Sequence, residues 1–422
     1  MCTLKPDTMT PSRFRRRSHT HSALMRLQPR VRAIVKRPFR LLWMEVRLIR
    51  WVKQDRNLAV FGTARNGFGD NAAHLFTSMS SDRGIRCVWI SGSRQLVRQL
   101  NREGFQAQYR WSLAGILTSV RAGWVVVDYY TRDVHIVLGR QAVVLNLWHG
   151  LPLKRLGKDI CTGPIAQHRN ARGFGVLVRW ATWDLHPPDF VLSSTPTVSR
   201  HFSTAHGVAE DRCLEFGYPR CDLLFERARP PSPLLVRDLD IWQRLRDAPF
   251  VVGYFPTWRD DGSDFLSTSG LSLRLLAETV RDEGGLFVCK LHPRTAHTLD
   301  TDGMLVLDAA NDLSSFLHLC SLVITDYSSI SFDFMLLARP LIYYVPDIDH
   351  YQETRGFYFS PEEAMAGPLI REPAQLFRAV QDTIRNGFLM PERAVEVRTR
   401  FWGDYSGGAS QKIGQFMRDW SS

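Results

Sequence analysis

Short apolar runs rich in β-branched residues alternate with helical patterns along most of this chain. In the first half such runs occupy 58–62, 86–90, 124–128, 142–147 and 190–193. A second series occupies 250–255, 286–291, 304–307, 322–325 and 341–345. Strands separated by helices predict a mostly parallel sheet. The pattern therefore predicts an α/β protein with two Rossmann-like domains that face one another across a cleft.

A proline-rich segment separates the two series. Pro230, Pro231 and Pro233 interrupt both patterns and indicate a hinge within 227–233. We therefore expect a first Rossmann-like domain over 55–230, a linker over 231–248 and a second domain over 249–422. The last helix of the second domain can pack back onto the first. Residues 1–54 precede both domains as a basic tail and an amphipathic helical segment.

Length and composition limit the class of protein. With 422 residues, 44% hydrophobic and 11% aromatic, the chain can form two large cores and is not predicted to be disordered. Its seven cysteines show no CxxC pair, which argues against a disulfide framework or a zinc knuckle and fits a reducing cytoplasm. The longest apolar run, 114–127, is interrupted by Arg121 and is shorter than the ~18 residues that span a bilayer. No signal-peptide pattern is present at the start of the chain.

The positive charge is concentrated at the N-terminus. Residues 1–53 carry 14 Lys and Arg against two acidic residues, whereas the remaining 369 residues carry 40 of each sign. From Arg40 to Lys53, helical spacing gives a basic side and an apolar side with Trp51 among its members. This pattern predicts an interfacial helix on an anionic membrane surface. The alternatives are a helix packed on the domain behind a basic tail, and a nucleic-acid arm, which we do not expect because no nucleic-acid module follows.

Polar groups follow several of the predicted strands. His292 lies in Lys290-Leu291-His292-Pro293, and the run Thr325-Asp326-Tyr327-Ser328-Ser329 comes 32 residues later. Strand ends that lead into loops or helix starts form phosphate sites, because unpaired N–H groups and the helix dipole favour an anion there. The chain is therefore predicted to handle phosphate groups.

Other candidates occupy equivalent positions. His149 follows the strand 143–147, and its ordinary pKa near 6.5 suits a general base for a hydroxyl, although it could equally be a structural histidine. Arg259 offers donors suited to a diphosphate, with Asp260 able to hold it, although a surface ion pair is the simpler interpretation.

The polar residues after 324 exceed what helix capping needs. Ser328 and Ser329 stand at the start of a predicted helix over 329–337, where capping accounts for one serine only. Asp333 falls one turn into that helix. Asp347-Ile348-Asp349 has the spacing of a metal-binding DxD, but so short a pattern is weak and no metal is assigned.

Seven short segments in the same order resemble the family of CDP-glycerol:poly(glycerophosphate) glycerophosphotransferases, which make teichoic acid and capsule polymers. The segments span residues 66 to 358: Asn66-Gly67-Phe68-Gly69-Asp70-Asn71, Trp148-His149-Gly150 with Lys154, Gly217-Tyr218-Pro219-Arg220-Cys221-Asp222, Pro256-Thr257-Trp258-Arg259-Asp260, Lys290-Leu291-His292-Pro293, Thr325-Asp326-Tyr327-Ser328-Ser329 and Arg355-Gly356-Phe357-Tyr358. The resemblance implies a GT-B fold, a nucleotide held mainly by the second domain, and association with the cytoplasmic membrane face.

The resemblance also implies roles for individual residues. His149 is the expected catalytic base, and His292 is expected to be catalytic and to contact the donor pyrophosphate together with Arg259. Ser328 and Ser329 are expected to bind donor phosphates. The remaining expected substrate-binding residues are Thr325, Asp333, Lys154 and Arg294.

The implied reaction moves glycerol phosphate from CDP-glycerol to a hydroxyl of a lipid-linked or polysaccharide acceptor, with CMP as the product and no cofactor. The chain has no long N-terminal extension like that of the larger polymerases, which leaves primase, single-transfer and short polymerase roles open. Two alternatives also stay open: a GT-B glycosyltransferase that uses a nucleotide sugar, and a non-catalytic basic scaffold.

Overall fold

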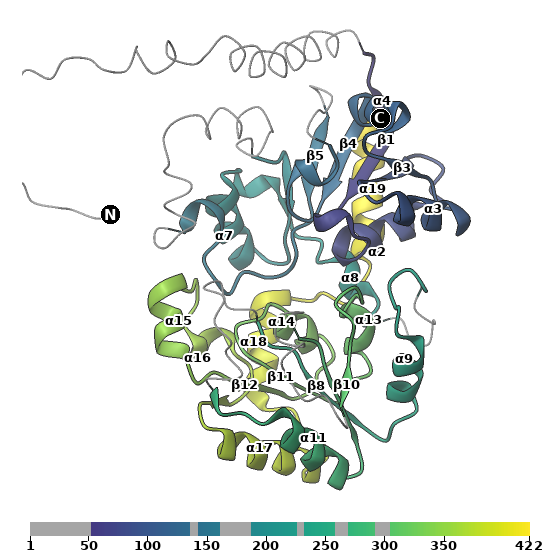
Figure 1. Cartoon of the computed structure of the whole chain (residues 1–422). Helices are drawn as coiled ribbons and strands as arrows, with labels where there is room; N and C mark the ends of the chain where they lie inside the picture. The colour runs from purple at the N-terminus through teal and green to yellow at the C-terminus, as the bar shows by residue number, and fades with distance from the viewer. Residues whose placement is uncertain (1–51, 136–141, 161–186, 226–231, 258–268, 292–303) are drawn as a thin grey trace, which may run out of the picture. The chain divides into compact units, whose positions relative to one another are not determined.

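Two parallel sheets organise the described part of the chain in a computed structural model (Figure 1). The described residues are 52–135, 142–160, 187–225, 232–257, 269–291 and 304–422. The first sheet has the order β3-β2-β1-β4-β5-β6-β7 and the second has the order β10-β9-β8-β11-β12-β13. Every strand pair is parallel, with register pairs such as Val60 with Val125 and Val323 with Leu341. The prediction of an α/β fold built on parallel sheets is confirmed.

The strands match the apolar runs closely. Those of the first sheet are β1 Asp55–Gly62, β2 Arg86–Ser91, β3 Ala107–Tyr109, β4 Ala122–Val127, β5 Val143–Asn146, β6 Phe190–Leu192 and β7 Cys213–Leu214. Those of the second are β8 Val251–Tyr254, β9 Leu286–Cys289, β10 Leu305–Val306, β11 Leu322–Thr325, β12 Leu341–Tyr344 and β13 Leu369–Ile370. Sequence patterns missed β3, β7 and β13, which are two or three residues long at the sheet edges. Runs that short show no period.

Both sheets reverse their strand order beside the first strand, between β1 and β4 and between β8 and β11. An aspartate follows the last strand of each pair. Asp128 Oδ1 accepts a hydrogen bond from the Ala72 N–H at 2.8 Å, and Asp326 Oδ1 accepts one from the Thr257 N–H at 2.8 Å. Ligands of open α/β sheets bind outside the carboxyl ends of strands at such reversals. The sheet topology and the sequence motifs therefore indicate the same strand-end loops as the place where a ligand would bind.

The helices around the first sheet are α2 Asp70–Met79, α3 Arg94–Arg102, α4 Leu113–Arg121, α7 Pro196–His206 and α8 Pro219–Asp222. Local chemistry sets several of their ends. Ser93 caps α3 by accepting from the Leu96 N–H, and Ser112 caps α4 by accepting from the Gly115 N–H. Helix α7 starts with Pro196 and ends at His206, and the following residue, Gly207, has a φ of 72° that suits glycine.

The helices that follow in sequence are α9 Leu239–Arg246, α11 Leu273–Asp282, α13 Ser314–Leu317, α14 Ile330–Met335, α15 Ile348–Arg355, α16 Pro361–Ala364, α17 Pro373–Arg385, α18 Glu392–Trp402 and α19 Ala409–Ser421. The last two connect the sheets. In α18, the Trp402 indole donates to the Phe332 carbonyl at 2.8 Å, while the Phe401 carbonyl accepts from Ser194 at 2.6 Å. Helix α19, yellow in Figure 1, lies beside α2 and β1, and its Arg418 pairs with Asp82.

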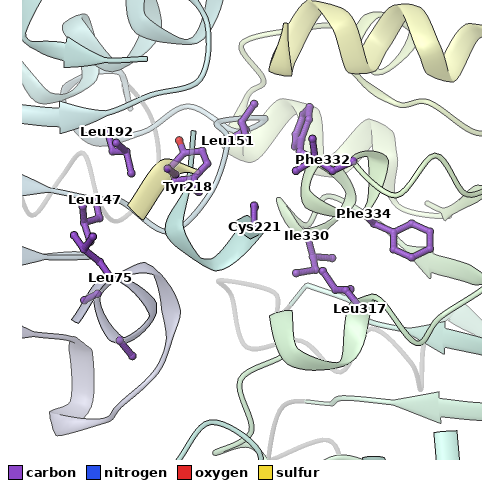
Figure 2. Close-up of a cluster of buried hydrophobic side chains, with 14 of the residues drawn as sticks. Leu75, Leu147, Leu151, Leu192, Tyr218, Cys221, Leu317, Ile330, Phe332 and Phe334 are labelled. Carbon is purple, nitrogen blue, oxygen red and sulfur yellow. The ribbon is translucent and has the colours of Figure 1, made fainter. Parts of the chain in front are cut away.

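One hydrophobic cluster extends from the first half, β1 to α8, into the second half, α9 to α19. Figure 2 shows Leu147 and Tyr218 of the first half in the same buried cluster as Leu317, Ile330 and Phe332 of the second. Packing at core density resists small displacements. The loops at the strand ends are therefore carried by a packed junction.

Some of the predicted features lie outside the described residues, and others concern the membrane and the cysteines. The amphipathic segment before residue 52 and most of the expected hinge, including Pro230 and Pro231, lie outside the described residues. Within the described ranges, no helix has the length and apolar character needed to cross a bilayer. The five described cysteines are buried free thiols: Cys87, Cys213, Cys221, Cys289 and Cys320.

Candidate active site

A cavity of about 160 Å³ brings together motifs from both halves. The first half contributes the turn Trp148-His149-Gly150 and the segment after it, and the second half contributes the loops that follow β8 and β11. The lining residues are Trp148, His149, Gly150, Leu151, Pro152, Leu153, Lys154, Leu156, Thr257, Tyr327, Ser328 and Ser329. His149 and Ser329, which are 180 positions apart in sequence, therefore face one space.

The His149 turn has a constrained backbone. Trp148 adopts a φ of 54° and Gly150 a φ of 131°, which L side chains rarely adopt. The Trp148 N–H donates to Asn146 Oδ1 at 2.9 Å, and the Trp148 carbonyl accepts from Asn71 Nδ2 at 2.8 Å. The His149 ring stacks on Tyr129, with centroids 4.2 Å apart and planes 13° apart. The imidazole is thus held by bonds to its own backbone turn and by an aromatic face.

Burial lowers the pKa of His149 from 6.5 to about 4, and Asp70 opposes the shift. His149 as a whole is half-buried and lines the cavity, while its buried Nδ1 atom has no hydrogen-bond partner among the described residues. At neutral pH the ring is therefore uncharged. A neutral imidazole can accept a proton, so the structure supplies the protonation state that a base needs through burial.

Ser328 and Ser329 bring two hydroxyls to the opposite wall. Ser329 occupies the N-cap position of α14, but its side chain makes no capping hydrogen bond. This helix covers Ile330–Met335, shorter than the predicted 329–337. A Cβ placed on Gly150 would lie 2.6 Å from Ser329 Oγ, so the backbone of the His149 turn approaches that hydroxyl closely.

A buried ion-pair network lies behind the turn. Arg220 Nη1 contacts Asp70 Oδ1 at 2.7 Å and donates to the His149 carbonyl at 3.0 Å, while Nη2 contacts Asp333 Oδ2 at 2.7 Å. Burial raises the pKa of Asp333 to about 6 although Arg220 opposes the shift. The pKa of Arg220 is raised, because Asp333 and Asp70 outweigh the lowering effect of burial. Arg220 therefore stays charged at any physiological pH.

Comparison with known proteins decides the family. The model of the CDP-glycerol:poly(glycerophosphate) glycerophosphotransferase family matches residues 44–418. The chain belongs to this family. As a member of the glycerophosphotransferase family it is a transferase, and the predicted enzyme class is confirmed.

Relatives of this glycerophosphotransferase differ in length. It is 26% identical over 380 residues to a teichoic acid glycerol-phosphate transferase of Staphylococcus aureus, covering 86% of this chain and 92% of the relative. It is 30% identical over 365 residues to a teichoic acid poly(glycerol phosphate) polymerase of Staphylococcus epidermidis, covering 82% of this chain but 46% of that protein. The chain thus spans nearly all of the first relative and about half of the second.

Solved structures share the fold of this glycerophosphotransferase. A structure of the wall teichoic acid polymerase TagF superimposes with a TM-score of 0.72 at 23% identity, covering 93% of this chain and 97% of that one. A UDP-GlcNAc 2-epimerase of Neisseria meningitidis superimposes with a TM-score of 0.51 at 15% identity, covering 86% and 99%. At these identities the likeness concerns the fold alone.

Two residues predicted to bind substrate in the glycerophosphotransferase are not among those that line the cavity. Thr325 is fully buried, and its hydroxyl donates to the Phe255 carbonyl at 2.6 Å. Asp333 is 1% exposed and faces Arg220. Alternation along β11 and the path of α14 turn both side chains inward. Their assignment to substrate stays a prediction, while the contacts seen are internal.

Lys154 lines the cavity and also connects the halves. It forms an antiparallel bridge with Phe357, and its ammonium lies 5.7 Å from the centroid of Tyr351. Next to it, the Tyr358 N–H donates to the Leu153 carbonyl at 3.0 Å. The Tyr351 ring stacks on Tyr327 at 4.0 Å. The Arg355-Gly356-Phe357-Tyr358 motif therefore contributes backbone that docks the segment after His149.

Four predicted residues, His292, Arg294, Arg259 and Asp260, lie outside the described residues. Lys290, two residues before His292, is half-buried, and its ammonium donates to the Asn311 carbonyl at 2.5 Å. The two aspartates of the DxD spacing have separate partners: Asp347 accepts from the Tyr327 hydroxyl, and Asp349 pairs with Arg371. Among the side chains that the structure describes, no group of three His, Cys, Asp or Glu is arranged to hold a metal.

Sequence reasoning assigned no role to Asp70, Asn71 and Arg220, although all three stand in the matching motifs. Asn71 Nδ2 binds the Trp148 carbonyl, and Asn71 Oδ1 accepts from the Arg220 N–H at 3.2 Å. A signal was present, because these polar residues follow β1 and β7 in motifs shared with the family. The sequence does not show that the motif containing Asp70 and Asn71 contacts the motif containing Arg220.

Proposed function

We propose that this glycerophosphotransferase moves glycerol phosphate from CDP-glycerol to a hydroxyl of a teichoic-acid-type acceptor and releases CMP. The observation that carries the proposal is that His149 and the Ser328 and Ser329 hydroxyls line one cavity at the strand ends of both halves. A base and phosphate-binding hydroxyls on opposite walls are what a phosphoryl-group transfer needs. The two doubly wound halves are consistent with a GT-B arrangement.

The reaction follows from the positions of these groups. Neutral His149 takes the proton of the acceptor hydroxyl as its oxygen attacks the β-phosphorus of CDP-glycerol. A new P–O bond forms, the bond from that phosphorus to the bridging oxygen breaks, and the electron pair leaves with CMP. Two negative charges on the bound diphosphate favour the protonated imidazole, so donor binding raises the pKa of His149 from its value of about 4. The base thereby gains strength where it is needed.

Charge neutralisation is the other requirement. Transition states of phosphoryl transfer are loose, and their stabilisation comes chiefly from positioned donors. Ser328 and Ser329 supply hydroxyls, and Lys154 supplies a cation at the same cavity. We assign Arg259, His292 and Arg294, which lie outside the described residues, to the diphosphate on the strength of their motifs.

The test is CMP release by the purified full-length protein from CDP-glycerol with a glycerol-phosphate-primed acceptor. We expect His149→Gln and Ser329→Ala to lower kcat by about 10²-fold to 10³-fold while the circular dichroism spectrum stays unchanged. Matched controls are His350→Gln and Ser80→Ala, which change the same residue types at exposed positions. Equal activity of site and control variants would reject the assignment.

Donor choice separates the two enzymatic alternatives. The protein is offered CDP-glycerol, CDP-ribitol and a UDP-linked sugar, and product mass is measured by mass spectrometry. We expect an added mass of glycerol phosphate. Transfer of the sugar alone from the UDP donor would establish a nucleotide-sugar glycosyltransferase instead.

We further propose that residues 1–53 hold the enzyme on the anionic cytoplasmic membrane face, where a lipid-linked acceptor is presented. The support is the charge of this segment, 14 basic residues against two acidic ones. Deleting it is expected to abolish sedimentation with vesicles containing phosphatidylglycerol and to preserve CMP release on a soluble acceptor. Retained vesicle binding would reject this role, and lost turnover would show that the segment serves catalysis itself.

A further inference from the structure

The motifs around His149 meet at one buried side chain, Arg220. Its guanidinium is 7% exposed and contacts three groups: Asp70 of the first half, Asp333 of the second half and the His149 carbonyl. Burying a charge is unfavourable unless its partners are well placed. We therefore expect Arg220 to do more than attract the two halves of the protein to one another.

The contact to Asp333 reaches the phosphate-binding side. Asp333 belongs to α14, and Ser329 occupies the N-cap position of the same helix. A helix turn is a rigid spacer, so holding Asp333 also holds Ser329. Through Nη2, Arg220 thus fixes the helix whose start carries the hydroxyls.

The contacts to Asp70 and to the His149 carbonyl reach the base. Arg220 Nη1 lies between these two acceptors at 2.7 Å and 3.0 Å. Asn71, the residue after Asp70, binds both the Trp148 carbonyl and the Arg220 backbone N–H. The turn that carries His149 is thereby bonded on each side of the imidazole-bearing residue.

Gly150 shows how close the two sides come. A Cβ at this position would lie 2.6 Å from Ser329 Oγ and 2.8 Å from Arg220 Nη2. The backbone turn therefore lies close to both the serine hydroxyl and the guanidinium. A shift of the guanidinium would change the spacing between base and hydroxyls.

We propose that Arg220 is a positioning residue for the transfer: bound to Asp70, Asp333 and the His149 carbonyl, it sets the distance between the base and the Ser329 hydroxyl across the two halves. This inference rests on the proposed function for its consequence in catalysis. It assigns a task to Asp70, Asn71 and Asp333 as well, since each holds Arg220 or the turn.

The experiment compares Arg220→Lys and Arg220→Met with a matched control, His74→Gln. His74 pairs with Asp312 and also joins the two halves, but its contact does not include the His149 turn. Lysine keeps the positive charge of Arg220 and loses the fork of donors. The measurements are kcat and KM for CDP-glycerol, the unfolding midpoint, and the NMR titration of the His149 ring in the unliganded protein.

We expect Arg220→Lys to lower kcat by about 10²-fold, the effect of a misplacement near 1 Å, with KM changed less than about threefold. We expect the His149 titration midpoint to move up by about one pH unit, because a loosened turn exposes the ring. His74→Gln should lower the unfolding midpoint without either effect.

Three results would overturn the proposal: Arg220→Lys with kcat near wild type, loss of kcat without a change in the His149 titration, or equal losses in His74→Gln. If Arg220→Met does not fold, Arg220→Lys alone decides. If the wild-type protein releases no CMP, the proposed function fails, while the titration still shows whether Arg220 sets the position of His149.

Discussion

Gly150→Ala tests whether the approach of the His149 turn to Ser329 matters for catalysis. Two effects add at this position. The φ of 131° is unfavourable for alanine, at a cost of about 1–3 kcal/mol. The new methyl group would also stand 2.6 Å from Ser329 Oγ and 2.8 Å from Arg220 Nη2. Both neighbours belong to the group of contacts that surrounds the proposed base, His149, and the Ser329 hydroxyl.

The displacement can be worked out from these distances. An ordinary contact needs at least 3.4 Å, so turn and serine must separate by about 0.8 Å from the 2.6 Å available. Arg220 blocks one direction of escape because it is bonded to Asp70 and Asp333. A displacement approaching 1 Å between a base and a reacting centre costs about 10²-fold in rate.

The assay measures CMP release and thermal unfolding for Gly150→Ala and for Gly284→Ala. Gly284 has a φ of 92°, and no described atom lies within 4 Å of a Cβ built there. Both substitutions therefore place alanine at a positive φ, but only Gly150→Ala also brings the new methyl group against neighbouring atoms. We expect Gly284→Ala to lose stability through backbone strain alone, and Gly150→Ala to lose more stability and also about 10²-fold in kcat. Equal kcat in the two variants would refute the reasoning that spacing across the cavity limits turnover.

Two further predictions concern buried titratable groups. Burial lowers the pKa of His149 to about 4, so an NMR titration of its ring in the unliganded protein should show a midpoint near pH 4, and a midpoint near 6.5 would contradict this. Because the unfolded histidine binds a proton below about pH 6.5, His149 contributes a loss of stability as pH falls from 6.5 to 4. Asp333 acts in the opposite sense, because burial raises its pKa from 3.8 to about 6. This group therefore lowers the free energy of unfolding by about 3 kcal/mol above pH 6 and leaves it unchanged below pH 3.8. Relative to Asp333→Asn, wild-type stability in urea should therefore fall by about 1 kcal/mol between pH 5 and 7.5, and a constant difference would show that Asp333 is not desolvated.

The order of the elements was predictable because each depends on a few neighbouring residues. Val125, Val126 and Val127 lie in a run that is apolar throughout, as expected for a strand covered on both faces, and β4 is buried along its whole length. The break at Arg121 in 114–127 marks the junction where α4 ends and β4 begins. Strands of two or three residues, such as β7 and β13, escaped because they hold no full period.

Part of the site was predictable for a related reason. In parallel sheets the strand ends that carry function point to one edge, so His149, Ser328 and Ser329 could be nominated from their positions after strands. The orientation of each side chain could not. Thr325 precedes Ser328 by three residues, yet it points into the core and bonds to the Phe255 carbonyl.

From the sequence alone came the two parallel sheets, the loops that line the candidate site and the family, because local periodicity and ordered motifs can be read without coordinates. Only the tertiary structure decided that Arg220 of one motif holds His149 of a second and Asp333 of a third, over separations of 71 and 113 positions. It also decided that burial lowers the pKa of His149 to about 4. Both results depend on which groups exclude water from one another, and that is a property of packing between distant segments.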